Sequence, residues 1–175
     1  MIEIPPIKEI LITEDQIKEK VKEIGRKISE DFKGDEVFLV SILRGGLIFL
    51  ADLIREIDVP LQYDTIEISS YGDEKFSSGV VRLIKDLKSN IEGKNVIIVE
   101  DIVDTGRSLH YLINNFKIRN PKALKVCVLL DKVDARVIEV PIDYHGFKIP
   151  NRFVVGYGLD YKGYLRNLPF VGAMD

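Results

Sequence analysis

A strand-like run that ends in a cluster of acids places the strongest constraint on how this chain can fold. Residues 96–109 read VIIVEDIVDTGRSL, and the four leading apolar residues are typical of a strand covered on both faces. Glu100, Asp101 and Asp104 follow, then a small polar turn over 105–108 and a return to helical spacing. Such a turn offers backbone N–H groups to an anion, and the acids fall at the carboxyl edge of a sheet. The order predicts a nucleotide-type site in an α/β protein.

Two other interpretations of this stretch are available. A Walker-type P-loop requires G-x-x-x-x-G-K-[ST], whereas this turn has one glycine and no lysine. The plainer alternative is a strand with an acidic edge followed by an ordinary helix cap, in which Asp104 caps the turn. Only other segments of the chain can decide against that alternative.

The composition is that of an ordinary globular protein. The chain has 175 residues, 46% hydrophobic and 30% charged, which is typical of one domain over 1–175. A net charge of −3 provides no basic field for nucleic acid, and no apolar run reaches the length of a membrane span. The N-terminal residues lack a signal-peptide pattern. We expect a soluble, cytoplasmic protein.

Cysteine and histidine give no sign of a metal site or a disulfide. Cys127 is the single cysteine and lies in an apolar run that reads as a buried strand. His110 and His145 are scattered, without the spacing of a zinc site. We therefore expect neither zinc nor a disulfide.

Strand-like and helix-like segments alternate along the chain. Thr13 and Gln16 form a capping-box pattern ahead of a helical repeat that runs to Phe32. Apolar strands are expected over 37–42 and 123–130. This alternation favours a mainly parallel sheet with helices on both faces. The other expected elements are a helix over 47–57 and strands over 61–69, 80–87, 142–147 and 153–157.

Four separated segments resemble the purine phosphoribosyltransferases, most closely the hypoxanthine-guanine family. They are residues 96–109, the Arg-Gly-Gly run at 44–46, LLDKVDAR at 129–136 and RFVVGYGLDYKGYLRNLPFVG at 152–172. Within the last segment, GYGLDY is not a dinucleotide fingerprint, because its third glycine is misplaced. The resemblance is strong because the segments occur in the expected order.

The resemblance implies the type I phosphoribosyltransferase fold. This fold has a Rossmann-like, mainly parallel sheet flanked by helices, expected here over roughly 13–140. A small hood over the carboxyl edge of the sheet would come from the chain ends, roughly 1–12 and 141–175.

The resemblance also implies roles for the residues at the acidic edge. Glu100 and Asp101 would bind the ribose hydroxyls, and Asp104 would be the general base near N7 of a purine. Because Glu100 and Asp101 are neighbours on a strand, we expect their side chains to point apart. The implied 5′-phosphate contacts are Asp104, Thr105, Gly106, Arg107 and Ser108. Lysine and threonine are frequent in the family where this chain has Arg107 and Ser108.

Pyrophosphate contacts are implied at Arg44, Gly45 and Arg166. In the family the peptide bond matching Arg44–Gly45 is cis, and lysine is often found in place of Arg44. Acids beside a polyphosphate are unfavourable unless a metal or hydroxyl intervenes, which favours Mg²⁺. The implied metal-site residues are Glu100, Asp101 and Asp160.

Purine contacts are implied further along the chain. Lys132 would donate to the C6 oxygen of the base and so reject adenine, since lysine offers only donors. Taken alone, Lys132 is more simply a surface ion-pair partner of Asp131 or Asp134, and Phe153 a core aromatic. Beside Lys132, the implied purine residues are Phe153, Val154 and Asp160. Ser70 and Tyr71 open a Ser/Gly-rich loop that resembles the flexible lid of the family.

The expected activity is Mg²⁺-dependent purine salvage. The 5-phosphoribosyl group of 5-phosphoribosyl-1-pyrophosphate (PRPP) would move to N9 of hypoxanthine or guanine, giving IMP or GMP and pyrophosphate. Whether xanthine is also a substrate, and whether the protein is a homodimer or a homotetramer, stay open. Lys132 disfavours an orotate or adenine transferase. The alternative from another class is a regulatory protein of the same fold that senses PRPP or nucleotides and binds nucleic acid.

Overall fold

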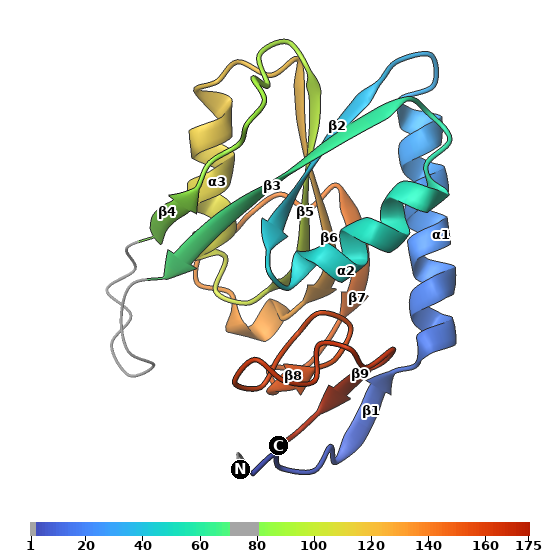
Figure 1. Ribbon diagram of the computed structural model, residues 1–175, viewed down its shortest axis with the longest axis vertical. Coiled ribbons are helices and arrows are strands. Elements are labelled where there is room, and N and C mark those ends of the chain that lie inside the picture. Colours follow the sequence, from blue (N-terminus) through green and yellow to red (C-terminus); the bar gives the residue numbers. More distant parts are fainter. Residues whose placement is uncertain (1–2, 71–80) are drawn as a thin grey trace.

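The computed structural model describes residues 3–70 and 81–175, apart from the side chain of Ser70. The strands are β1 (Glu9–Ile12), β2 (Val37–Leu43), β3 (Leu61–Ser70), β4 (Val81–Lys85), β5 (Asn95–Val103), β6 (Ala123–Asp131), β7 (Tyr144–Lys148), β8 (Val154–Val155) and β9 (Val171–Ala173). The helices are α1 (Glu14–Asp31), α2 (Gly46–Leu53) and α3 (Arg107–Lys117), with 3-10 turns η1 (Ile54–Glu56) and η2 (Val133–Ala135). Figure 1 shows these elements as two sheets with the helices against the larger one.

The larger sheet has the strand order β4-β3-β2-β5-β6-β7 in the described residues. Neighbouring strands run parallel except β3 and β4, as the alternation of segments predicted. The central strands β2 and β5 are buried almost throughout, because helices cover both faces of the sheet. The loops after these parallel strands therefore leave the same edge, which is where open α/β sheets bind ligands.

The helices divide between the two faces. α1 and α2 cover one face and α3 the other, as Figure 1 shows, and each side has its own core. The capping box forms as predicted, with the Thr13 backbone N–H donating to Gln16 Oε1 at 2.8 Å and Gln16 N–H to Thr13 Oγ1 at 3.3 Å. The helix predicted over 47–57 is shorter than expected, because the α-helical pattern gives way to η1 after Leu53.

The smaller sheet joins both ends of the chain in the antiparallel order β1-β9-β8. Figure 1 shows it beyond the edge at which the parallel strands end. The expected hood range of 141–175 is wrong in one part, since β7 extends the larger sheet beside β6. The reason is packing: Tyr144 of β7 is buried in the core under α1, and the partly buried Phe147 packs against the same core.

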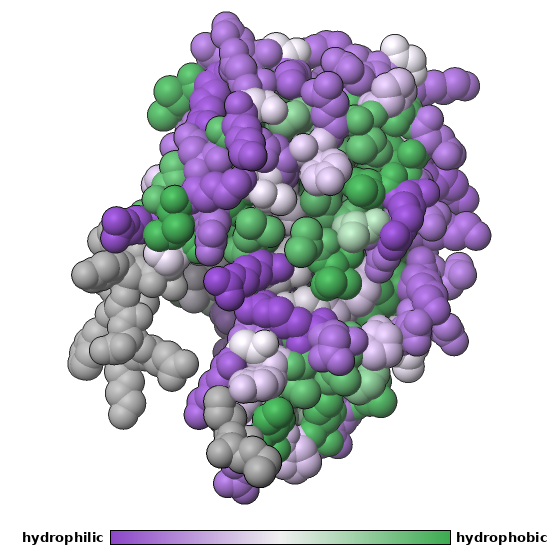
Figure 2. All heavy atoms as spheres, viewed as in Figure 1, coloured by the Kyte–Doolittle hydropathy of each residue, from purple (hydrophilic) through white to green (hydrophobic). Residues whose placement is uncertain are grey.

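The surface carries both polar and apolar regions. Figure 2 shows hydrophobic residues gathered over α2 and again over the smaller sheet, with hydrophilic residues between them. Leu47 and Ile48, in the first turn of α2, contribute exposed apolar side chains. None of the helices in the part of the chain that the structure describes is long and apolar enough to cross a membrane.

Candidate active site

The loop between β2 and α2 contains a cis peptide bond. It joins Leu43 to Arg44, one residue earlier than the Arg44–Gly45 position that the family resemblance implied. Gly45 already has helical dihedral angles, φ −60° and ψ −43°, so the irregular bond precedes it. Arg44 is exposed, and its carbonyl oxygen accepts a hydrogen bond from the backbone N–H of Leu47 at 3.3 Å.

Both glycines of this loop are packed against the neighbouring strands. A Cβ built on Gly45 would overlap the Oδ2 atom of Asp101, at the end of β5. A Cβ on Gly46 would lie 2.6 Å from the buried Oγ of Ser41. The absence of side chains therefore lets the loop approach the acidic edge closely.

Glu100 and Asp101 are both buried, and their carboxyl groups interact. Burial raises the pKa of Glu100 well above its usual range, and the charge of Asp101 and a hydrogen bond between the two groups add to this. Burial also raises the pKa of Asp101, although hydrogen bonds from Glu100 and the Ile102 N–H oppose the rise. The expectation that these side chains point apart is wrong. Ile102 packs with the same core as Val99, so the strict alternation of faces is lost at the end of β5.

The loop over 156–168 brings Arg166 to the same place. The Arg166 guanidinium donates to the carbonyl oxygen of Gly158 at 2.6 Å and pairs with Asp160 Oδ1 at 2.7 Å. A Cβ built on Gly158, whose φ is +99°, would overlap the carbonyl oxygen of Gly45. Arg166 is also close enough for its charge to lower the pKa of Asp101. The predicted pyrophosphate and metal residues thus gather at one edge.

The turn over 104–108 forms the mouth of a small cavity. Gly106 adopts φ +83° at the start of α3, a conformation that favours glycine. The carbonyl oxygen of Thr105 accepts two backbone hydrogen bonds of 3.0 Å, from Val137 and Ile138. A cavity of about 110 Å³ adjoins this turn. Its lining residues are Glu100, Ile102, Val103, Asp104, Thr105, Gly106, Ser108 and Leu109.

Lys132 lies beside Asp104. The Lys132 side chain is mostly buried, and its Nζ is 3.2 Å from Asp104 Oδ2, whose side chain is half exposed. The backbone N–H of Lys132 donates to the carbonyl oxygen of Val103 at 3.0 Å, which fixes the residue after β6 against the end of β5. The partner of Lys132 is therefore neither Asp131 nor Asp134, the two acids of the plainer interpretation.

The remaining predicted residues lie in or next to the smaller sheet and in β3. Phe153 is 48% exposed, with its ring edge-on to Tyr161 at a centroid distance of 6.1 Å. Val154 is buried in β8, where it pairs with Ala173. Ser70 is the last residue of β3, and Tyr71 lies outside the described residues, so the predicted lid has no structural account here.

The donor set at the acidic edge suits Mg²⁺. Mg²⁺ prefers carboxylate oxygens and commonly keeps one or two protein carboxylates together with phosphate oxygens and water. The buried, mutually repelling pair of Glu100 and Asp101 fits that preference. Among residues 3–70 and 81–175 there is no group of three or more His, Cys, Asp or Glu side chains placed to hold a metal alone. Oxygens from a substrate would have to complete the coordination.

A family model described as a phosphoribosyl transferase domain matches residues 9–162. The chain belongs to the phosphoribosyltransferase family. A hypoxanthine-guanine phosphoribosyltransferase of Mycobacterium avium is 46% identical, over 97% of this chain and 86% of its own length. A crystal structure of a hypoxanthine-guanine phosphoribosyltransferase from Bacillus anthracis has a TM-score of 0.92 at 47% identity, covering 97% of this chain and 100% of that one.

Some relatives are much longer. The bifunctional protein TilS/HprT of Listeria monocytogenes is 44% identical over 96% of this chain, which spans 26% of the length of that protein. The match is thus to one part of those phosphoribosyltransferase relatives.

Sequence reasoning missed two contacts that support the site of this phosphoribosyltransferase. The Arg136 side chain and the Ile138 carbonyl lie where a Cβ at Gly106 would be, so this segment backs the turn. The Tyr157 hydroxyl donates to Asp52 Oδ2 at 2.6 Å, which joins the 156–168 loop to α2. Neither contact has a sequence signature, because the residues that meet lie far apart in the chain.

Proposed function

We propose that this phosphoribosyltransferase transfers the 5-phosphoribosyl group of PRPP to N9 of hypoxanthine or guanine, giving IMP or GMP and pyrophosphate. The observation that carries the proposal is the contact of Lys132 with Asp104, 3.2 Å apart beside the turn over 104–108. Lys132, a donor that would select the purine, and Asp104, a proton acceptor, then lie together next to a turn that can bind a phosphate. The names of the full-length relatives support the same substrates.

The 5′-phosphate binds at the turn that opens α3. Backbone N–H groups over 105–108 and the helix dipole favour an anion there, and the hydroxyls of Thr105 and Ser108 add donors. Arg107 adds a positive charge in the same turn. Asp104 begins this phosphate turn and also faces the base.

The ribose and pyrophosphate lie towards the buried acids. Glu100 and Asp101 accept hydrogen bonds from the ribose hydroxyls, while Gly45 and Arg44 offer backbone and side-chain donors to the pyrophosphate. Arg166 adds a guanidinium from the opposite loop. Glu100, Asp101 and Asp160 are the carboxylates from which ligands of Mg²⁺ would come, together with phosphate oxygens and water, and the bound ion would supply positive charge to the leaving pyrophosphate.

The purine is selected by Lys132. Its ammonium group donates to an oxygen at C6 of hypoxanthine or guanine and has no acceptor for the amino group of adenine. Phe153 stacks on the base and the backbone of Val154 contacts its edge. Asp104 takes up the proton that the purine loses, and the neighbouring Lys132 keeps that carboxylate oriented. Xanthine also has an oxygen at C6, so it belongs among the bases to be tested.

The same resemblance suggests where the enzyme acts, how it assembles and what it binds. We propose a cytoplasmic enzyme that acts as a homodimer or homotetramer on free PRPP and purine bases, with no nucleic acid partner. The acidic balance of the chain, a net charge of −3, supports the last point.

The direct test is identification of the products. Pure protein is incubated with PRPP, Mg²⁺ and either hypoxanthine or guanine, and nucleotide and pyrophosphate are quantified by chromatography. We expect one IMP or GMP and one pyrophosphate for each PRPP consumed. Binding of PRPP or GMP without any product would overturn the proposal and favour the regulatory alternative, which a nucleic acid binding assay on the same preparation then examines.

A further inference from the structure

One buried hydroxyl joins the 156–168 loop to α2. The side chain of Tyr157 is buried, with 6% of the residue exposed, and its hydroxyl donates to Asp52 Oδ2 at 2.6 Å. Asp52 lies near the end of α2 and also forms an ion pair with Arg55. Burial and the neighbouring Asp52 raise the pKa of Tyr157, so the hydroxyl stays protonated and remains a donor.

The backbone next to this tyrosine reaches the acidic edge. The backbone N–H of Tyr157 donates to the carbonyl oxygen of Leu168 at 2.8 Å. The backbone N–H of Gly158 donates to the carbonyl oxygen of Arg166 at 3.0 Å. The Arg166 guanidinium returns a hydrogen bond to the Gly158 carbonyl at 2.6 Å. Gly158 in turn lies against the carbonyl of Gly45. The residue that bears the hydroxyl and the residue that contacts the β2–α2 loop are therefore adjacent in the chain.

The other end of the anchor belongs to the element that carries Gly45. Gly45 immediately precedes α2, and Phe49 and Leu50 hold that helix in the core. The Tyr157–Asp52 hydrogen bond thus fixes the loop bearing Arg166 to the same rigid helix as Gly45. This bond therefore links the segments that carry Gly45 and Arg166, two of the residues with proposed pyrophosphate contacts.

We propose that Tyr157 is a positioning residue for the pyrophosphate end of PRPP. Its hydroxyl contacts Asp52 and not the reacting atoms, so it acts by holding the loop that carries Gly158 and Arg166 against Gly45. This inference rests on the function proposed above. It requires that loss of the hydroxyl affects the two substrates differently. PRPP binding should weaken, whereas purine binding at Lys132 and Phe153 should stay unchanged.

The chain supplies a matched control. Tyr144 is 2% exposed, and its hydroxyl donates to Asp31 Oδ2 at 2.8 Å. This pair joins β7 to α1, away from the acidic edge, but has the same chemistry and similar burial. Tyr157→Phe and Tyr144→Phe each remove one hydroxyl without changing the ring. A difference in PRPP binding between the two variants therefore reports where the hydrogen bond lies, and not the general cost of losing a buried tyrosine hydroxyl.

Three measurements are made on both variants and the wild-type protein. Calorimetry gives the affinity for PRPP, and steady-state kinetics give kcat and the KM values for PRPP and hypoxanthine. Amide hydrogen exchange over 156–168 is followed in the free protein. For Tyr157→Phe we expect the Kd and KM for PRPP to rise about 3- to 10-fold, the effect of one net hydrogen bond, with the KM for hypoxanthine unchanged. Exchange in the loop should accelerate. Tyr144→Phe should show none of these changes.

An unchanged PRPP affinity in Tyr157→Phe, or an equal change in Tyr144→Phe, overturns the inference. Unchanged exchange over 156–168 in Tyr157→Phe overturns it as well, without any reference to substrate. A wild-type protein that binds PRPP but turns over neither hypoxanthine nor guanine overturns the proposed function and leaves the positioning of PRPP supported by its own binding data. Replacement of the acceptor by Asp52→Ala should reproduce the effect of Tyr157→Phe, and the double variant should not add to it.

Discussion

The carboxylate of Asp101 lies against the backbone of Gly45, in the space that a side chain at residue 45 would fill. Since Gly45 has an ordinary helical φ of −60°, the requirement for glycine is steric and not conformational. We predict that Gly45→Ala displaces the β2–α2 loop and raises the KM for PRPP at least tenfold, with a loss of stability of about 1–3 kcal/mol. Kinetics and thermal unfolding measure the two effects.

Gly34→Ala is the control for that prediction. Gly34 has φ +83° with no atom near the place of a Cβ, so alanine there costs stability through the backbone alone. The KM for PRPP should stay at the wild-type value in this control. A normal KM in Gly45→Ala would contradict the close approach of the β2–α2 loop to Asp101.

Lys132→Met tests base selection. Methionine keeps most of the buried volume and removes the donor that we propose for the C6 oxygen of the purine. The kcat/KM for hypoxanthine should fall by about 10²- to 10⁴-fold and that for adenine should change little, because a site built to bond one group discriminates strongly. Competition between the two bases measures the ratio. Lys125 lies on β6, the strand that precedes Lys132, and Lys125→Met, which breaks its 2.9 Å pair with Asp143, should leave the ratio intact.

Asp104→Asn separates proton transfer from binding. An amide cannot accept a proton, so kcat should fall by about 10²- to 10⁴-fold while the affinity for PRPP stays within a few-fold. Calorimetry with PRPP and single-turnover kinetics give the two numbers. Equal losses in affinity and turnover would mean that Asp104 only shapes the turn. Asp86→Asn, which removes a surface pair with Arg119, should change neither.

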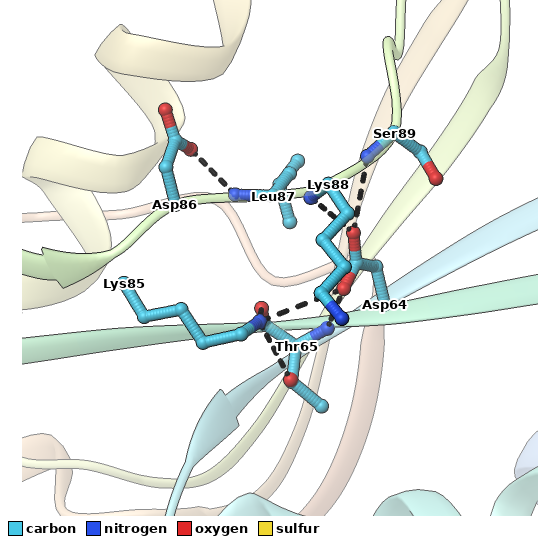
Figure 3. A network of polar contacts seen from close by, with 7 residues as sticks. All are labelled: Asp64, Thr65, Lys85, Asp86, Leu87, Lys88 and Ser89. Atoms are coloured by element: carbon cyan, nitrogen blue, oxygen red, sulfur yellow. Dashed lines mark hydrogen bonds and ion pairs between the residues drawn. The ribbon is translucent and has the colours of Figure 1, made fainter.

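Asp64 stabilises the segment after β4. Figure 3 shows its carboxylate among the backbone N–H groups of Thr65 and Lys88, each at 2.7 Å, and of Ser89 at 3.3 Å. Burial alone would raise the pKa of Asp64, but these hydrogen bonds outweigh it and lower the pKa. Lys85 adds a charge at 3.7 Å.

A lowered pKa in the folded state means that ionised Asp64 stabilises the protein above its ordinary pKa. This contribution is lost as the pH falls below the ordinary value of 3.8 through the lower folded value. Asp64→Asn should therefore cost about 1–2 kcal/mol at neutral pH and make the unfolding free energy fall less steeply below pH 5. Denaturant unfolding at several pH values measures this, and parallel curves for the two proteins would contradict it.

The sequence predicted the features that depend on local pattern. The capping box at Thr13 and the buried runs of β2 and β5 depend on spacing and apolar content alone. The acidic edge followed, because parallel strands end on one side of their sheet. Gly45, which follows β2, and Asp101, near the end of β5, lie together at this edge for that reason.

What the sequence did not reveal depends on tertiary contacts. The interaction of Glu100 with Asp101 arises because the strand alternation is lost at Ile102, which no periodicity signals. The place of β7 in the larger sheet follows from the burial of Tyr144 under α1. The hydrogen bond of Tyr157 to Asp52 spans 105 positions of the chain, so neither residue indicates the other.

The most direct test of the account is the kcat/KM of the wild-type protein for hypoxanthine, guanine, xanthine and adenine, each with saturating PRPP and Mg²⁺. Lys132 beside Asp104 predicts efficient use of hypoxanthine and guanine and a value for adenine lower by about 10⁴-fold. The kcat/KM for xanthine, measured in the same series, shows whether xanthine is also a substrate. Efficient turnover of adenine, or no turnover of any base, would contradict the account.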